Sequence, residues 1–387
     1  MTGAEDIGDR VVPAVSPRIS DATLRDSAHM AGVEFGPRDA SAIARLLVAT
    51  GVDLVEVGMV SGPGSKDADL VLATHEAVGP ERSMTLLVVR DRRQVATALD
   101  EAERLGVRHV MYSIPTSEQH AALKLGTPSA KLLTALVRSA VGQAKERGFH
   151  VTFSGEDGAR TPAGRLVPYV TAGFEAGADR FRLAETVAYL SPWQMERVIG
   201  DLTEIDGAEI EIHSHNMLGL AVANSLAAVR AGARWVSATV GGIGERGGNA
   251  PLAELLTALR VIHGDTRFDL SHLTELSRLA LRGAQLGEAF QPGPTTAHAF
   301  AYELPGQLTH PEAYETLPAE LVGNTRELKV RTRLTPALVG WALTDSGLDV
   351  DVTAFTPWLA ARQEENGRPL LDRDAIRKAA VDFTAAT

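Results

Sequence analysis

Short apolar segments alternate with longer amphipathic segments along residues 18–263. The apolar segments predict buried strands, and the amphipathic segments predict helices that cover them. We predict strands at residues 18–24, 53–58, 84–89, 108–113, 149–154, 179–183, 208–213 and 235–240. We predict helices at residues 39–50, 92–105, 129–147, 192–204, 218–231 and 250–263. Eight strand–helix units in about 245 residues match the count and length of a (β/α)8 TIM barrel.

Glycines mark the ends of several predicted helices, as at Gly51, Gly106, Gly177 and Gly232. A glycine just past a helix supplies the left-handed residue that ends it. A doubly wound open sheet is the alternative α/β fold, and it would usually show a glycine-rich phosphate loop after its first strand. The first predicted turn, residues 25–29, contains no glycine, so the pattern favours the barrel.

The pattern changes after residue 264, where one helix is predicted at 269–288 and residues 289–326 are rich in Pro, His, Thr and Gly. A long irregular segment in a compact protein is usually functional or a linker. Further helices are predicted at 335–347, 352–365 and 372–386. We therefore expect a flexible N-terminus (1–16), a catalytic barrel (17–288), and a linker with a mostly helical C-terminal subdomain (289–387).

The composition is that of a soluble globular protein, with 44% hydrophobic and 22% charged residues. No apolar run approaches the length needed to span a bilayer, and residues 1–16 lack the features of a secretory signal. The net charge is −11 without a long basic run, which disfavours nucleic acid as a partner. The absence of cysteine excludes disulfides and thiolate chemistry. We expect a cytoplasmic protein that binds neither nucleic acid nor membrane.

Polar residues gather at the predicted strand ends, where the chemistry of such a barrel sits. In chain order they are Arg25 with Asp26, Glu56, Arg90, Ser113, Ser154 with Glu156, Glu185 with Thr186, and His213 with His215. Only the eighth end, at Gly241 and Gly242, lacks a polar side chain. One polar barrel mouth is the simplest interpretation.

His213 and His215 are the strongest candidates for a metal site. Residues i and i+2 of a strand point to the same side, and neutral imidazole is a common metal ligand. Asp26 can add a carboxylate because the first strand neighbours the last in a closed barrel, and Asn249 can add a carbonyl oxygen. This set suits Mg, Mn, Co, Fe(II) or Zn. Arg25 beside it could hold a substrate carboxylate or the charge of an enolate.

Several motifs carry a resemblance to a known family: Thr-Leu-Arg-Asp (23–26), Pro-Thr-Ser-Glu-Gln-His with Lys124-Leu125 (115–125), Phe-Ser-Gly-Glu-Asp-Gly-Ala-Arg-Thr (153–161), Glu-Thr-Val-Ala-Tyr-Leu (185–190), His-Ser-His-Asn (213–216), Gly-Leu-Ala-Val-Ala-Asn-Ser (219–225) and Gly-Ile-Gly-Glu-Arg-Gly-Gly-Asn-Ala (242–250). The sequence resembles the metal-dependent (β/α)8 enzymes that include homocitrate synthase, 2-isopropylmalate synthase and citramalate synthase. The likeness covers roughly residues 18–330 and continues more weakly to the end.

The resemblance implies a divalent ion on Asp26, His213 and His215, with Asn249 near or in its shell. It implies that Arg25 polarises a 2-oxo acid or its enolate. It also implies that Glu156 lies by the acyl group of acetyl-CoA, and that Thr186 contacts the carboxylate of the 2-oxo acid. Arg90 is predicted as a second residue that binds the substrate's anionic group, although an exposed arginine at a helix start is an equal alternative.

The chain departs from the synthases at several positions. Ser27 and His29 stand where the synthases have Gly and Gln, whereas a histidine at position 29 is what the 4-hydroxy-2-oxo acid aldolases show, there as the catalytic base. Met217 replaces an aspartate. In the linker, residues 299–307 are shortened and lack the family's catalytic histidine, so Tyr302, His298 or His29 are the candidates to replace it.

The main prediction is a Claisen condensation of an acyl-CoA with a 2-oxo acid, and acetyl-CoA is the expected acyl-CoA. A metal-dependent aldolase or lyase that acts on pyruvate with His29 as base is the first alternative. A barrel that binds metal without catalysis is the second. The 3-hydroxy-3-methylglutaryl-CoA lyases are disfavoured, because they use a cysteine after the eighth strand. As in the family, we expect a homodimer.

Overall fold

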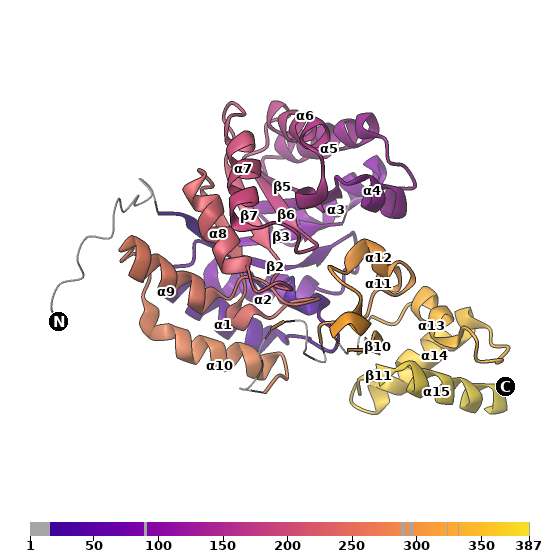
Figure 1. Ribbon diagram of the computed structural model, residues 1–387. Helices are drawn as coiled ribbons and strands as arrows, with labels where there is room; N and C mark the ends of the chain where they lie inside the picture. Colours follow the sequence, from indigo (N-terminus) through magenta and orange to yellow (C-terminus); the bar gives the residue numbers. More distant parts are fainter. Residues whose placement is uncertain are drawn as a thin grey trace.

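The computed structural model describes residues 16–88, 91–287, 290, 292–293, 296, 298–322, 324–331 and 333–386. Eight parallel strands close into a barrel in chain order, with helices around the outside (Figure 1). The strands are β1 (Arg18–Leu24), β2 (Leu54–Val60), β3 (Ser83–Leu87), β4 (His109–Pro115), β5 (His150–Glu156), β6 (Arg180–Glu185), β7 (Ile210–Ser214) and β8 (Trp235–Ala238). The predicted TIM barrel is confirmed.

The surrounding helices are α1 (Pro37–Thr50), α2 (Ala68–Val78), α3 (Arg92–Arg104), α4 (Glu118–Leu125), α5 (Ala130–Glu146), α6 (Ala163–Glu175), α7 (Pro192–Thr203), α8 (Ala221–Arg230), α9 (Leu252–His263) and α10 (Leu273–Gly283). The pattern did not single out α2, α4 and α6. α10 is shorter than the helix expected at 269–288: a 3₁₀ turn (Leu270–His272) precedes it, and the helix ends at Gly283. The predicted last strand is also shorter, since residues 240–242 form a 3₁₀ turn.

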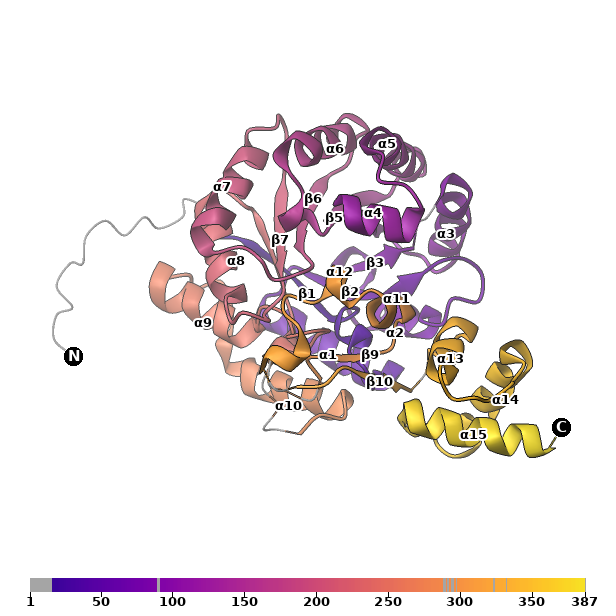
Figure 2. The ribbon, with the colours of Figure 1, turned by 45° about the vertical axis from the view of Figure 1, so that its right-hand side comes forward.

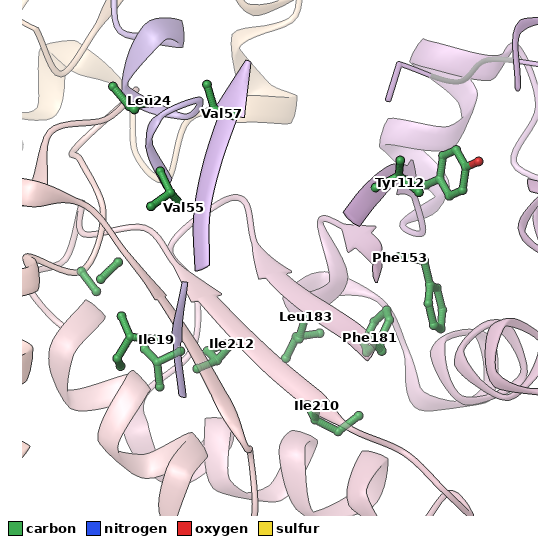
Figure 3. Packing of buried hydrophobic residues seen from close by; sticks show 14 of the residues in the cluster. Ile19, Leu24, Val55, Val57, Tyr112, Phe153, Phe181, Leu183, Ile210 and Ile212 are labelled. Carbon is green, nitrogen blue, oxygen red and sulfur yellow. The ribbon is translucent and has the colours of Figure 1, made fainter. Parts of the chain in front are cut away.

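Alternation along the strands separates an apolar outer layer from a mixed barrel interior, which holds charged residues such as Arg182 and Glu211 and a small apolar cluster around Met84 and Met111. Ile19, Phe153, Phe181 and Ile212 are fully buried members of the large apolar cluster that includes both strand and helix residues (Figure 3). The packing is close: a Cβ at Gly173 of α6 would lie 2.3 Å from the Phe153 ring. Glycine at this position therefore lets helix and strand approach each other.

Helix ends follow the sequence signals. Gly51 ends α1 with φ 101°, and its N–H bonds the last carbonyls of that helix. Ser191 and Gln194 form a capping box at the start of α7. These local signals explain why the alternation of strands and helices could be predicted from the sequence.

The C-terminal region contains the three-stranded sheet β11-β10-β9 and several helices. Its elements are β9 (Ala301–Tyr302), α11 (Pro305–Thr309), α12 (Pro311–Tyr314), β10 (Glu327–Val330), α13 (Pro336–Leu343), α14 (Val352–Glu365), β11 (Leu371–Asp372) and α15 (Arg373–Ala386). Helices α13–α15 form a group beside the barrel, with α11 and α12 between them and the strands (Figures 1 and 2). In the described part of the chain, no helix is long and apolar enough to cross a membrane.

Candidate active site

A cavity of about 700 Å³ opens at the C-terminal ends of the barrel strands. One side is formed by polar residues of β1, β7 and the loop after β8, including Arg25, Asp26, His213 and His215. The apolar part of the wall includes Met59, Leu86 and Met111 from β2, β3 and β4, and residues of α11 and α12 complete the mouth. In Figure 2, α11 and α12 lie in front of the barrel strands.

Asp26, His213 and His215 converge as the sequence predicted. Their ligand atoms all lie within 4.8 Å of one another, and all three residues are buried. β7 ends in His213 and Ser214, and His215 pairs with Asn249 in an isolated bridge. The pairing of β1 with β8 brings the first turn beside the loop after β8, where Ser27 Oγ donates to the Ile243 carbonyl at 2.8 Å.

The donor set fits a divalent cation. Asp26 Oδ2 and Asn249 Oδ1 are buried and without a hydrogen-bond partner in the described structure. His215 Nδ1 lies 3.2 Å from the Gly248 carbonyl, which can only accept, so the proton sits on Nδ1 and Nε2 carries the lone pair. His213 Nδ1 is held by Ser237 Oγ at 2.9 Å. Two imidazole lone pairs, a carboxylate and a spare amide oxygen are the predicted ligands.

The protonation states also suit metal binding. Burial lowers the pKa of His215 to about 4 and the pKa of His213 well below its usual value. Burial alone would raise the pKa of Asp26, but the charge of Arg25 holds it well below the ordinary value. Neutral imidazoles and an ionised carboxylate are the forms that bind metal. Arg246 Nη2 lies 2.9 Å from His215 Nε2 and donates to it.

The glycine-rich loop after β8 is shaped around Asn249. A Cβ at Gly244 would lie 1.7 Å from Asn249 Oδ1 and 3.4 Å from Asp26 Oδ2. Gly248 has φ 82°, and a Cβ there would lie 2.2 Å from the Gly242 carbonyl oxygen. The motif therefore provides the space in which Asn249 meets the two histidines.

Arg25 is fixed by carboxylates on two sides. It forms ion pairs with Asp26 and with Glu56, which is fully buried. Glu56 was expected at the end of its strand, but it lies within β2 and points into the barrel, because the strand runs on to Val60. There Glu56 Oε2 accepts from Arg182 Nη1 at 2.7 Å, and Arg182 Nη2 donates to Glu211 at 2.8 Å.

The sequence patterns did not lead us to predict this ion network inside the barrel. Its signal was the alternation of charged and apolar residues in Arg180-Phe181-Arg182 on β6 and Ile210-Glu211-Ile212 on β7. On barrel strands, such alternation places one set of side chains inside. Arg182 also lines the cavity floor, so the network directly supports the site.

His29 lines the cavity beside Asp26, His213 and His215. One of its ring nitrogens lies within 4.8 Å of carboxylate oxygens of Asp26 and Glu245, and Nε2 lies 3.1 Å from Met59 Sδ. Burial lowers the pKa of His29 to about 4, so the ring is neutral. Glu245 was quoted in a motif but not identified as a site residue, although its position before Arg246 and Asn249 places it in the cavity wall.

Glu156 lies in the cavity wall between two cationic or hydrogen-bonding partners. His120 Nδ1 is 2.6 Å from Oε1, and Lys124 Nζ is 2.7 Å from Oε2. Burial alone would raise the pKa of Glu156, but Lys124 and His120 outweigh it and hold the pKa at about 2. Glu156 is therefore a permanent anion at neutral pH. Its partner Lys124 also lines the cavity.

The other predicted residues have different positions. Thr186 lines the cavity, and its hydroxyl accepts from the Asp157 N–H at 2.8 Å. Arg90 lies outside the described residues. Neither Tyr302 nor His298 is among the described residues that line the cavity. Tyr302 Oη is 3.1 Å from a Glu315 oxygen.

The linker contributes cavity residues that the sequence did not reveal. Gln307, His310 and Tyr314 line the mouth, and Gln307 Nε2 donates to Glu245 Oε2 at 2.6 Å. Within the same chain, the Ala313 carbonyl accepts from Arg160 Nη2 at 2.6 Å. The irregular segment therefore lies against the barrel of its own chain.

Curated relatives are synthases by name. The chain is 35% identical to 2-phosphonomethylmalate synthase of Streptomyces rubellomurinus, across 85% of this chain and 88% of that enzyme. It is 31% identical to 2-isopropylmalate synthase 2 of Caldanaerobacter subterraneus subsp. tengcongensis, across 92% and 94%. With (R)-citramalate synthase of Methanocaldococcus jannaschii it shares 33% identity across 80% of this chain and 63% of that enzyme, so it spans less than two thirds of that relative.

Solved structures agree on the fold. The HMG-CoA lyase of Brucella melitensis superimposes with a TM-score of 0.61 at 18% identity, over 70% of this chain and all of that one (100%). Residues 16–280 match the HMGL-like family, and this match contains the barrel and all of the proposed metal ligands. The chain belongs to the HMGL-like family.

Proposed function

We propose that this protein is a metal-dependent synthase that condenses an acyl-CoA, in the simplest case acetyl-CoA, with a 2-oxo acid. Hydrolysis of the thioester by water then releases CoA and gives a 2-hydroxy-2-substituted dicarboxylic acid. The observation that carries the proposal is the buried cluster of Asp26, His213 and His215 beside Arg25 at the barrel mouth. The relatives named as citramalate, isopropylmalate and phosphonomethylmalate synthases support the reaction class.

The metal, held by Asp26, His213, His215 and Asn249, would supply Lewis-acid polarisation of the ketone and a template for the neighbouring carboxylate. Arg25 binds the anionic oxygens of the 2-oxo acid and stabilises the charge that develops during the condensation. Its guanidinium is already oriented by Glu56, so little reorganisation is needed when substrate binds. Thr186, directly after β6, offers its hydroxyl to the substrate carboxylate from the cavity wall.

His29 is our candidate for the residue that removes a proton from the methyl group of the thioester. The support is its place in the cavity wall, next to the metal cluster and facing the apolar wall at Met59. Glu156 is held as an anion by Lys124 and His120, which suits a role in orienting the thioester rather than in exchanging protons.

The direct test is thiol release from acetyl-CoA with Mn²⁺ and a panel of 2-oxo acids. We expect release with at least one 2-oxo acid, and none after the metal is removed by a chelator. The absence of release across a broad panel of 2-oxo acids and acyl-CoAs would contradict the proposal.

A metal-dependent pyruvate aldolase or lyase is the second candidate, and the position of His29 beside Asp26 and Glu245 favours it. This candidate predicts deuterium exchange into the methyl group of pyruvate without any acyl-CoA. Exchange that survives in His29→Ala would remove the support for this candidate.

We also propose that the protein acts as a homodimer in the cytoplasm, as the family resemblance suggests. Light scattering at micromolar concentration tests the assembly, and a monomeric mass would contradict it.

A further inference from the structure

The cavity carries more positive charge than an acidic protein would suggest. Among the described residues that line it, five are cationic: Arg25, Lys124, Arg182, Arg246 and Arg333. Lining carboxylates are fewer, namely Asp26, Glu156 and Glu245. With a net charge of −11 over the whole chain, this local excess indicates that the cavity is built for anions.

Four of these cations are already paired with carboxylates. Arg25 pairs with Glu56 and Asp26, and Arg182 pairs with Glu56 and Glu211. Lys124 pairs with Glu156 at 2.7 Å, and Arg246 pairs with Glu245 at 2.6 Å. These pairs hold the walls in place, so their charges are largely compensated before substrate arrives.

Arg333 differs from the other four. It makes no hydrogen bond or ion pair to any of the described residues. Glu303 is the nearby carboxyl, and it accepts hydrogen bonds from the backbone N–H groups of Gly32 and Arg331 rather than from Arg333. Burial raises the pKa of Glu303, and the positive charge of Arg333 acts in the opposite direction. A half-buried guanidinium with its donors free, inside a substrate-sized cavity, is available for a ligand.

The backbone around Arg333 is anchored rather than free. Arg331 donates from Nε to the Gly32 carbonyl at 3.2 Å and from Nη1 to the Arg368 carbonyl at 3.1 Å. Two residues after Arg333, the Thr335 hydroxyl caps α13 by accepting from the Leu338 N–H. The C-terminal region therefore presents Arg333 to the cavity from a defined position, on the side of His29, whose pKa its charge helps to lower after burial.

We propose that Arg333 is a specificity-determining residue that binds an oxyanion of a substrate: a carboxylate, phosphonate or phosphate other than the carboxylate bound at Arg25 and the metal. A guanidinium suits such a group because it can donate two parallel hydrogen bonds. The oxyanion has two sources, a second acidic group on the 2-oxo acid or a phosphate of the acyl-CoA. The inference rests on the proposed function for the identity of these two substrates.

The test measures binding by calorimetry with Mn²⁺-loaded protein, so that it does not depend on turnover. The probes are the matched pairs 2-oxoglutarate with 2-oxopentanoate and CoA with pantetheine, and the variants are Arg333→Gln and Arg333→Lys. We expect Arg333→Gln to weaken one anionic probe about tenfold or more while its matched neutral-ended probe changes less than about twofold. Arg333→Lys should recover only part of the affinity, because it loses the two-pronged geometry.

If Arg333→Gln loses affinity only for 2-oxoglutarate, the oxyanion belongs to the 2-oxo acid. If it loses affinity only for CoA, the oxyanion is a phosphate of the acyl-CoA. Lys329→Gln is the matched control, since it removes a positive charge from the same region, where Lys329 pairs with Glu327 and Asp372 on the surface. Three results would overturn the inference. Arg333→Gln could bind both anionic probes as tightly as the wild type does, or it could lose the same affinity for all four probes. The third result is a wild type that binds neither anionic probe. Wild-type protein that shows this Arg333-dependent binding but no thiol release would contradict the proposed function instead.

Discussion

The two sides of the cavity are built in different ways. The metal side consists of strand ends and the loop after β8, where Asp26, His213 and Asn249 are buried and held by neighbouring strands. The linker side consists of short helices and irregular backbone, with Gln307, His310 and Arg333 reaching into the cavity. We propose that the reaction chemistry belongs to the metal side, which is built from strand ends, and that substrate choice belongs to the linker side.

The largest effect should follow from changing the metal side itself. Asp26→Asn removes the only negative ligand of the proposed set, so we expect metal affinity to fall at least about 100-fold and thiol release to fall about 1,000-fold. Metal content by mass spectrometry and steady-state rates check this. A variant that keeps both its metal and its activity would show that Asp26 is not a ligand.

The next largest effect should come from the ion network beneath the metal side. Glu56→Gln leaves Arg25 and Arg182 buried with less compensation, so we expect a loss of about 3–5 kcal/mol in unfolding free energy. Because Arg25 also loses its ion pair with Glu56, the rate of thiol release should fall as well. Urea denaturation measures the stability, and Glu175→Gln in the half-exposed pair with Arg138 should cost less than about 1 kcal/mol. Equal losses in both variants would mean that the buried network contributes no more than a surface pair.

The stability of the barrel beneath the metal side should depend on pH through Asp21. Burial raises the pKa of Asp21 in β1 to about 7 from an ordinary value of 3.8. The folded state therefore favours the protonated acid, so the contribution of this residue to stability is full below about pH 4 and is lost as the pH rises to about 7. Asp21→Asn removes this pH-dependent loss of unfolding free energy, which amounts to at most about 4 kcal/mol.

The measurement is the urea midpoint of wild type and Asp21→Asn at pH 5 and pH 8. We expect the urea midpoint of Asp21→Asn to increase relative to that of the wild type between pH 5 and pH 8. A constant difference between the two proteins would show that Asp21 does not titrate with folding in this range.

The smallest effect should come from the linker side. Gln307→Leu removes the 2.6 Å hydrogen bond to Glu245, so we expect KM for one substrate to rise about three- to tenfold with metal content unchanged. Thr309→Ala is the nearby control: Thr309 also lines the cavity, but among the described residues its hydroxyl donates only to Pro305 of its own helix. Loss of metal in Gln307→Leu would mean that the two sides are not separable.

Much of the metal side could be predicted because it depends on strand periodicity. The i, i+2 spacing of His213 and His215, and the closure of β1 against β8, were enough to place Asp26 beside them. Glu56 was misplaced by the same reasoning, because the sequence does not mark where β2 ends. The alternation that places Arg182 and Glu211 inside the barrel was present in the sequence but short.

The sequence by itself determined the barrel, its strand order and the convergence of the candidate metal ligands, because a closed parallel sheet leaves one arrangement for its strand ends. Only the tertiary structure decided the linker side. Residues 298–333 have no period that relates sequence position to direction, so the positions of His310, Tyr314 and Arg333 follow from where the segment packs. That packing depends on contacts between residues far apart in the chain, such as Ala313 with His120 and Arg160.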